Sequence, residues 1–170
     1  MHTNTLLVTS ITESTGKTAV TLALGGLAQE RGLTVGYMKP KGTRLQSNVG
    51  KTLDEDPMLA RELLGLDSEM HQMEPIVYSP TFVDGVIRGQ EDPDELGEIV
   101  EEYFAELAAD TDLMLIEGGG SWTTGGIVDL TDVDIADRLD ANVLLVADYV
   151  QSRDLDDIVV AAESFGDRLA

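Results

Sequence analysis

A Gly-Lys-Thr tripeptide follows a short apolar run near the N-terminus and is the first candidate for chemistry. The run is TLLVTS (5–10), and the tripeptide is Gly16-Lys17-Thr18 in the stretch ITESTGKTAV. A strand, a turn and a helix that begins at such a tripeptide form a phosphate-binding loop, in which backbone N–H groups and the helix N-terminus hold phosphates. Lys17 would then reach the terminal phosphates, and Thr18 would place its hydroxyl on Mg²⁺. The alternative is an ordinary helix start with a solvated lysine.

A second Gly-Lys-Thr stands at 50–52, in SNVGKTL (47–53). It has no apolar strand directly before it, and three acids follow it at 54–56. Carboxylates in that position would repel a polyphosphate, so we interpret this segment as a mobile lid rather than as a second phosphate-binding loop.

A carboxylate at the end of another apolar run is the third candidate. DLMLIEGGG (112–120) delivers Glu117 and then three glycines. Such a carboxylate can hold Mg²⁺ directly or through water, and glycines allow a backbone to approach a ligand closely. The alternative is a strand that runs into a glycine turn.

These candidates need a scaffold, and the apolar pattern predicts one. Strand-like runs alternate with helical patterns, which indicates an α/β fold with a parallel sheet covered by helices on both faces. Ligands in such folds bind at the carboxyl ends of the strands. We expect strands at 5–10, 34–40, 74–80, 112–120 and 142–149, and helices at 18–31, 57–65, 93–109 and 155–165.

The chain has no internal repeat or linker, so residues 1–170 are expected to form one domain. The acidic stretch IVDLTDVDIADRLDA (127–141) is interpreted as a loop that passes into a helix with a solvated acidic face, rather than as a cation site. The sheet core is assigned to Leu6, Val8, Val35, Leu113, Leu115, Leu144 and Val146.

The charge balance restricts the partners. The chain has 11 Lys+Arg against 32 Asp+Glu, a net charge of −21. Such a field repels nucleic acid and anionic membranes, so neither is an expected partner. A carboxylate-coated surface suits concentrated salt, which screens self-repulsion, and it indicates a halophilic, haloarchaeal source. With no cysteine, no leader and no membrane-length apolar run, we expect a cytoplasmic protein.

Lysine is scarce and clustered. The four lysines all lie between residues 17 and 51, so we expect each of them to meet an anion, with chance clustering as the alternative. They are Lys17, Lys39, Lys41 and Lys51.

Together these stretches resemble the dethiobiotin synthetase-like P-loop family. That family has a loop with five residues between a small first residue and Gly-Lys-Thr, matched here by Ser10, 11–15 and Gly16, with serine where glycine is usual. GYMKPKGT (36–43) is similar to the family's Gly-Tyr-Lys-Pro strand end, and EGGGSW (117–122) to its Glu-Gly-x-Gly-x-Trp element. The resemblance implies a P-loop nucleoside triphosphatase fold that binds ATP and Mg²⁺.

The resemblance also implies roles for individual residues. Lys17 and Lys39 would be catalytic, with Lys39 meeting the substrate's carbamate and the γ-phosphate, and Thr43 on the substrate side. Thr18, Glu117 and Asp56, which lies in EDPMLA, would hold the metal. The nucleotide would be held by Ser14, Thr15, Gly16, Lys17, Thr18, Ala19 and Gly118.

The C-terminal part departs from the synthetase pattern. ADYVQSRDLDD (147–157) has no glycine and several acids where synthetases bind a carboxylate, although Arg153 could serve one. The chain stops at Ala170, before the strand that helps to hold adenine in the family, so the domain is truncated or its base site is incomplete. In these features it resembles the N-terminal domain of phosphotransacetylases and of DRTGG-domain proteins.

Three functions therefore stay open. One is an accessory or regulatory nucleotide-binding module, and another is an ATP-dependent carboxylase or ligase of the dethiobiotin synthetase type. The third is a fold that has lost its nucleotide. The resemblance further implies a homodimer and a fused or missing C-terminal domain.

Overall fold

The computed structural model describes residues 3–43, 45–48 and 51–170. Its centre is a four-stranded parallel sheet with the order β2-β7-β1-β8. The strands are β1 (Asn4–Ser10), β2 (Val35–Met38), β7 (Leu113–Glu117) and β8 (Asn142–Val146). The expected α/β fold is thereby confirmed.

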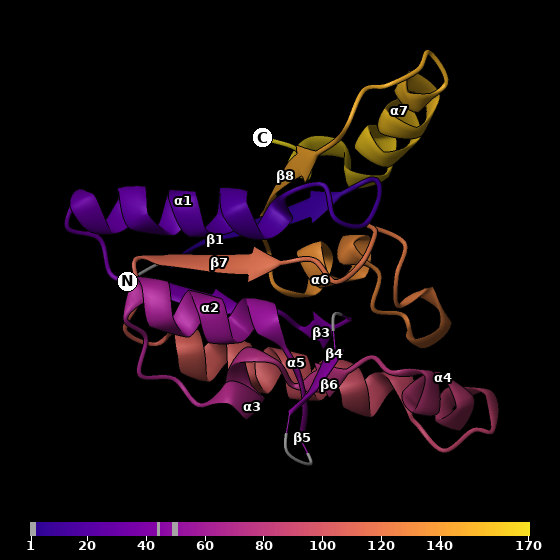
Figure 1. Cartoon of the computed structure of the whole chain (residues 1–170), viewed down its shortest axis with the longest axis horizontal. Coiled ribbons are helices and arrows are strands. Elements are labelled where there is room, and N and C mark those ends of the chain that lie inside the picture. Colours follow the sequence, from indigo (N-terminus) through magenta and orange to yellow (C-terminus); the bar gives the residue numbers. More distant parts are fainter. Residues whose placement is uncertain (1–2, 44, 49–50) are drawn as a thin grey trace.

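Helices connect these strands and cover the sheet (Figure 1). They are α1 (Lys17–Glu30), α2 (Glu55–Leu64), α3 (Met70–Met73), α4 (Pro80–Ile87), α5 (Pro93–Ala108), α6 (Asp132–Arg138) and α7 (Asp154–Phe165). The two short 3₁₀ turns of the described residues are η1 (Gly126–Val128) and η2 (Gly166–Arg168), and η2 follows α7 directly. In the described part of the chain, no helix has both the length and the apolar content that a membrane span requires.

Local sequence explains where the helices begin. The side chain of Asp54 caps α2 by accepting from the amide of Asp56, and Gly65 ends that helix in the left-handed region. Pro93 occupies the first turn of α5, where a missing N–H costs nothing. Thr131 and Asp134 form a capping box at α6, so the acidic stretch 127–141 does pass from a loop into a helix. The expected solvated acidic face is wrong for Asp132, which is buried.

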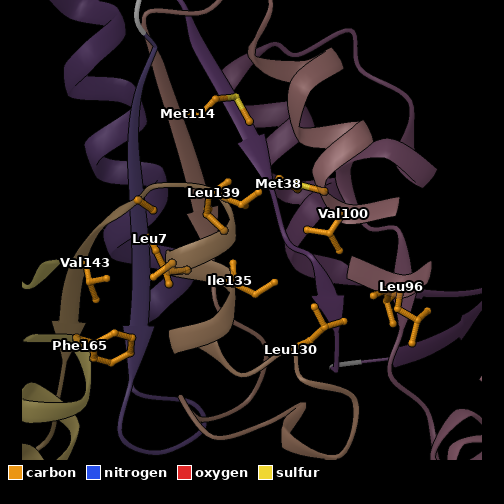
Figure 2. Close-up of a cluster of buried hydrophobic side chains, with 14 of the residues drawn as sticks. Leu7, Met38, Leu96, Val100, Met114, Leu130, Ile135, Leu139, Val143 and Phe165 are labelled. Carbon is orange, nitrogen blue, oxygen red and sulfur yellow. The ribbon is translucent and has the colours of Figure 1, made fainter. Parts of the chain in front are cut away.

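The larger part of the core lies on one face of the sheet, against α5 and α6. Figure 2 shows Leu7 and Met114 from the sheet gathered with Val100, Ile135 and Leu139 from the helices. On the opposite face, a smaller cluster packs under α1 and α2, and includes the buried residues Ala28, Val35, Leu64 and Leu115.

The predicted core needs a correction. Val8, Val35 and Leu115 are buried as expected, but four of the assigned residues are only half-buried. Successive side chains of a strand point to opposite faces, and the apolar runs gave no sign of which face was better covered. In addition, β8 is an edge strand of this sheet. The half-buried residues are Leu6, Leu113, Leu144 and Val146.

The expected strand at 74–80 is also largely wrong. Only β6 (Ile76–Val77) forms, and it pairs with β3 (Lys41–Gly42) outside the central sheet. Pro75 and Pro80 have no N–H for a longer ladder, and Pro80 begins α4 with Ser79 as its cap.

A hairpin and α7 extend from opposite sides of the molecule. The antiparallel pair β4 (Leu45–Asn48) and β5 (Lys51–Asp54) was not expected from the sequence. Figure 1 shows it on the side of α3 and α4, whereas α7 lies beyond β8.

Candidate functional site

The site lies at the carboxyl edge of the sheet, where β1 ends at Ser10 and β7 ends at Glu117. Val8 is paired with Glu117 in the parallel register, so the loops that follow the two strands are neighbours. A cavity of about 520 Å³ opens there. It is lined by every residue that the sequence predicted for the site, namely Ser14, Thr15, Gly16, Lys17, Thr18, Ala19, Lys39, Thr43, Asp56, Glu117 and Gly118.

The loop after β1 has the backbone that a phosphate cradle needs. Gly16 stands at the N-cap of α1 with φ 93°, a conformation that disfavours side chains. Ser14 is left-handed at φ 59°. Ser10 ends a strand in extended backbone, so serine replaces the usual glycine there without strain.

The side chain of Lys17 is folded into this loop and is 7% exposed. Its ammonium donates to the hydroxyl of Ser10 at 2.8 Å and to the carbonyl of Gly120 at 2.7 Å. Burial lowers the pKa of Lys17, while the charges of Asp132 and Glu117 oppose that shift. Because an ammonium has three N–H groups, these two contacts leave capacity for a phosphate oxygen.

The side chain of Lys39 lies among carboxylates. Its ammonium is 2.9 Å from Asp54, 3.8 Å from Glu117, and hydrogen-bonded to Asp56. Burial opposes the charge, but Glu117 and Asp54 outweigh it, so the pKa of Lys39 is raised. This lysine is thus held in its charged form beside the carboxylates predicted to hold a metal.

The carboxylate of Glu117 is buried and hydrogen-bonded on both oxygens. Thr18 donates to Oε1 at 2.7 Å, and the hydroxyl of Tyr37 donates to Oε2 at 2.9 Å. Burial raises the pKa of Glu117 to about 7, although Lys39 lowers it. A bound cation would lower the pKa of Glu117 and so favour its ionised form.

The donor atoms fit Mg²⁺. Thr18, Asp56 and Glu117 offer the hard oxygen ligands that Mg²⁺ prefers, and a lysine ammonium already lies between the two carboxylates. Among the described residues, no set of three or more His, Cys, Asp and Glu side chains is arranged to hold a metal alone. Mg²⁺ would therefore complete its shell with phosphate oxygens and water, as it commonly does.

The far side of the cavity is formed around Thr43. Its backbone N–H donates to Asp54 at 3.0 Å, and its side chain is half-buried. Arg153, considered for a carboxylate, is exposed and does not line this cavity.

The second Gly-Lys-Thr does not begin a helix. Gly50 lies outside the described residues, and Lys51 and Thr52 belong to strand β5. The interpretation of this segment as a lid stays a prediction.

Sequence reasoning missed a buried acid behind the site. Oε2 of Glu74 accepts from the amide of Asp54 at 3.1 Å, while its Oε1 is buried with no hydrogen-bond partner among the described residues. Burial and the charge of Asp54 raise the pKa of Glu74 to about 7, although its bond to the Asp54 amide lowers it. A Cβ on Gly42 would lie 1.7 Å from Glu74 Oε1, so a side chain at this position would displace the Glu74 carboxylate.

An ion pair between Lys41 and Asp132 was also missed, with a separation of 3.0 Å. The scarcity of lysine had pointed to Lys41 as a residue that meets an anion. No signal identified Asp132, which lies 91 residues away in the chain.

Comparison with known proteins supports a nucleotide-binding fold. A family model described as AAA domain matches residues 4–170. The chain is 34% identical over 142 residues to an ATP-dependent dethiobiotin synthetase of Parafrankia, covering 83% of this chain and 57% of that protein. It is 26% identical over 162 residues to a cobyric acid synthase of Clostridium botulinum, covering 84% and 33%.

A third relative is an ATP-dependent dethiobiotin synthetase of Methanococcus vannielii, 26% identical, with 95% of this chain and 66% of that protein covered. The chain thus spans about one-third to two-thirds of the length of these relatives. Among solved structures, the kinase domain of the Escherichia coli tyrosine kinase ETK matches with a TM-score of 0.55 at 14% identity. That match covers 95% of this chain and 63% of the other, and it supports the fold alone.

Proposed function

Because the chain belongs to the AAA domain family and is a P-loop domain related to dethiobiotin synthetase and cobyric acid synthase, we propose that it binds Mg–ATP in the cavity at the carboxyl edge of its sheet. One observation carries the proposal. A single cavity is lined by a lysine at a helix N-terminus, a second buried lysine and two carboxylates from separate elements. Each of these four buried charges costs desolvation free energy. Their presence in one cavity therefore favours a nucleotide site over a fold that has lost its nucleotide.

In this proposal the loop holds the phosphates through backbone N–H groups between Ser14 and Ala19, with Gly118 on the opposite wall. Lys17 binds the terminal phosphates, where its remaining N–H capacity is available. Mg²⁺, held by Thr18, Asp56 and Glu117, would neutralise charge on the phosphates. Their roles rest on the resemblance and on the position of each side chain at the cavity.

We propose that the domain is an accessory or regulatory module of a phosphotransacetylase-like or DRTGG-domain protein. The segment 147–157 supports this proposal, because none of its residues lines the cavity in the described structure. A synthetase would need a carboxylate-binding group at that place. Nucleotide occupancy would then be transmitted to a partner domain through a loop or interface.

An ATP-dependent ligase of the dethiobiotin synthetase type is the second candidate. The observation in its favour is that Lys39 and Thr43 both line the cavity, with Lys39 charged. In that reaction Lys17 and Lys39 would stabilise charge on the γ-phosphoryl group while a carbamate oxygen attacks it in line.

Phosphate release separates the two candidates. The protein would be saturated with Mg–ATP, or with Mg–GTP to test the base, in molar KCl, and phosphate would be followed with and without a diamino acid and bicarbonate. Binding with very slow, unstimulated release is the expected result for a regulatory module. Release stimulated by the added substrates would establish the ligase instead, and absence of binding would contradict both.

The remaining proposals concern the setting of the domain. We propose a cytoplasmic, haloarchaeal protein that acts as a homodimer, in which residues 1–170 form one nucleotide-binding domain next to a further C-terminal domain. The net charge of −21 supports the saline setting, and the partial coverage of the relatives is compatible with a further domain.

A further inference from the structure

A buried ion pair lies beneath the glycine loop of residues 118–120, and the proposed nucleotide chemistry does not use it. Lys41 and Asp132 are each 1% exposed, with their charged atoms 3.0 Å apart. A buried pair gains little net stability, because desolvation of the two charges offsets their attraction. Net stability therefore does not explain why this ion pair is buried here.

The pair ties together segments that are far apart in the chain. The ammonium of Lys41 also donates to the carbonyls of Thr124, at 2.8 Å, and of Leu130. On the other side, the hydroxyl of Thr9 in β1 donates to the second oxygen of Asp132. The end of β1, the strand β3 and the loop that follows the glycines are thus joined at one point.

The glycine loop rests directly on this junction. A Cβ on Gly118 would lie 2.1 Å from Oδ2 of Asp132, and one on Gly119 would lie 2.2 Å from the carbonyl oxygen of Lys41. The next residue, Gly120, is the one whose carbonyl accepts from Lys17. A shift of the ion pair would therefore move the wall of the cavity that holds Lys17.

We propose that Lys41 and Asp132 are positioning residues, which fix the glycine loop and thereby the carbonyl of Gly120 that orients Lys17 toward the phosphates. This inference rests on the proposed binding of Mg–ATP. Neither residue lines the cavity, so they act through the loop and not by touching the ligand.

The test replaces the pair with neutral side chains of similar shape. In Lys41→Met/Asp132→Asn both charges are removed together, which avoids leaving one of them unpaired in the interior. Thr9→Val is the milder variant, since it keeps the branched side chain in β1 and removes only one hydrogen bond to Asp132. Val100→Ala, on the buried face of α5, is a control that destabilises the fold without changing a side chain that bonds to the ion pair.

Two measurements are made on each folded variant in molar KCl. Calorimetry gives the affinity for Mg–ATP, and acrylamide quenching reports on Trp122, the single tryptophan of the chain. Trp122 is joined to this junction because its amide donates to the carbonyl of Ser10 and its carbonyl accepts from the amide of Asp132, both at 2.9 Å. Quenching therefore reports on the loop independently of the nucleotide.

We expect the double variant to bind Mg–ATP about tenfold more weakly and Thr9→Val about threefold more weakly, because a displaced loop misplaces Lys17. Acrylamide should quench Trp122 more in both variants than in the parent, while Val100→Ala matches the parent in affinity and quenching.

Parent-like affinity and quenching in the folded double variant would overturn the inference. If the double variant does not fold, parent-like values for Thr9→Val have the same meaning. If the parent itself binds no Mg–ATP, the proposed function is wrong. Quenching then still tests the positioning role, and unchanged quenching of Trp122 in the variants would overturn it.

Discussion

At the scale of single residues, Lys39 is the most strongly coupled charge of the site. It lies within 4 Å of Asp54, Asp56 and Glu117, and its side chain is 2% exposed. Such a lysine connects the end of β5, the start of α2 and the end of β7 through ion pairs and a hydrogen bond to Asp56. Its removal should therefore affect stability as well as any chemistry in the cavity.

Lys39→Met should lower the free energy of unfolding by about 3 kcal/mol, since it removes the ammonium from a buried group of carboxylates. Chemical denaturation in molar KCl measures the change. Lys17→Met is the matched control, because the two direct acceptors of Lys17, a hydroxyl and a carbonyl, are uncharged, and its loss should be smaller. An equal or larger loss for Lys17→Met would contradict this account of the site's charges.

Glu74 should make stability depend on pH. Its pKa in the folded protein is about 7, above the ordinary value of 4.5. The folded state therefore keeps a proton that the unfolded chain releases, so this group's contribution to stability is complete below pH 4.5 and is lost as the pH rises to about 7.

Glu74→Gln removes that loss. The variant should match the parent near pH 4.5 and be more stable by about 3 kcal/mol at pH 8, from a pKa shift of about 2.5. Urea unfolding at both pH values measures the difference, with the exposed Glu98→Gln of α5 as control. A pH-independent difference between Glu74→Gln and the parent would show that the proton on Glu74 is not the cause.

How far the sequence predicted the site depends on the kind of residue. Those in local motifs, such as Lys17, Thr18 and Glu117, could be placed at the cavity because strand ends of a parallel sheet meet at one edge. The partners Asp132 and Glu74 could not, since their contacts join loops distant in the chain and no motif marks them. The scarcity of lysine indicated Lys41 of the buried ion pair, but not its partner Asp132.

At the scale of elements, β1, β7 and α1 carry the site, and all three were predicted within a few residues. Their signals are local, namely apolar runs that stop at polar or glycine-containing loops. The β4–β5 hairpin was missed because it pairs outside the central sheet. Helix α4 was missed although Phe82 and Val86 pack against the core, because eight residues with an internal glycine give only a short helical pattern in the sequence. The sequence also could not predict which face of the sheet carries the larger part of the core. A strand such as β1 has apolar residues on both faces, so its pattern does not distinguish them.

Gly119 of the site and Gly26 of α1 should respond differently to alanine. In Gly119→Ala the new Cβ would meet the backbone of Lys41 at 2.2 Å, so we expect a loss of about 2 kcal/mol in stability. Gly26→Ala in α1 has nothing within 4 Å and should stabilise the protein by about 1 kcal/mol through helix propensity. Thermal unfolding of both variants measures this, and a stable Gly119→Ala would mean that the loop does not rest on Lys41.

At the scale of the whole molecule, the net charge of −21 dominates. Self-repulsion among 32 acidic side chains opposes the compact state, and only 11 basic ones offset it. The nucleotide carries negative charge as well, so both folding and binding should depend on screening.

The unfolding temperature should therefore rise by about 5 °C between 0.1 M and 1 M KCl, as the Debye length falls from about 10 Å to about 3 Å. Differential scanning calorimetry measures the rise, and NaCl at the same ionic strength is the control, because screening depends on ionic strength and not on the monovalent cation that supplies it. A transition that is insensitive to KCl, or that rises in KCl but not in NaCl, would contradict the electrostatic explanation.

The central claim is that Mg–ATP binds at the Gly16-Lys17-Thr18 loop, and calorimetric titration in molar KCl tests it most directly. The parent should bind Mg–ATP at one site, and Lys17→Ala should bind at least about tenfold more weakly, because it loses a charge-assisted contact to the phosphates. Equal affinity in the two proteins would place the nucleotide elsewhere. Absence of binding by the folded parent would contradict the nucleotide assignment altogether.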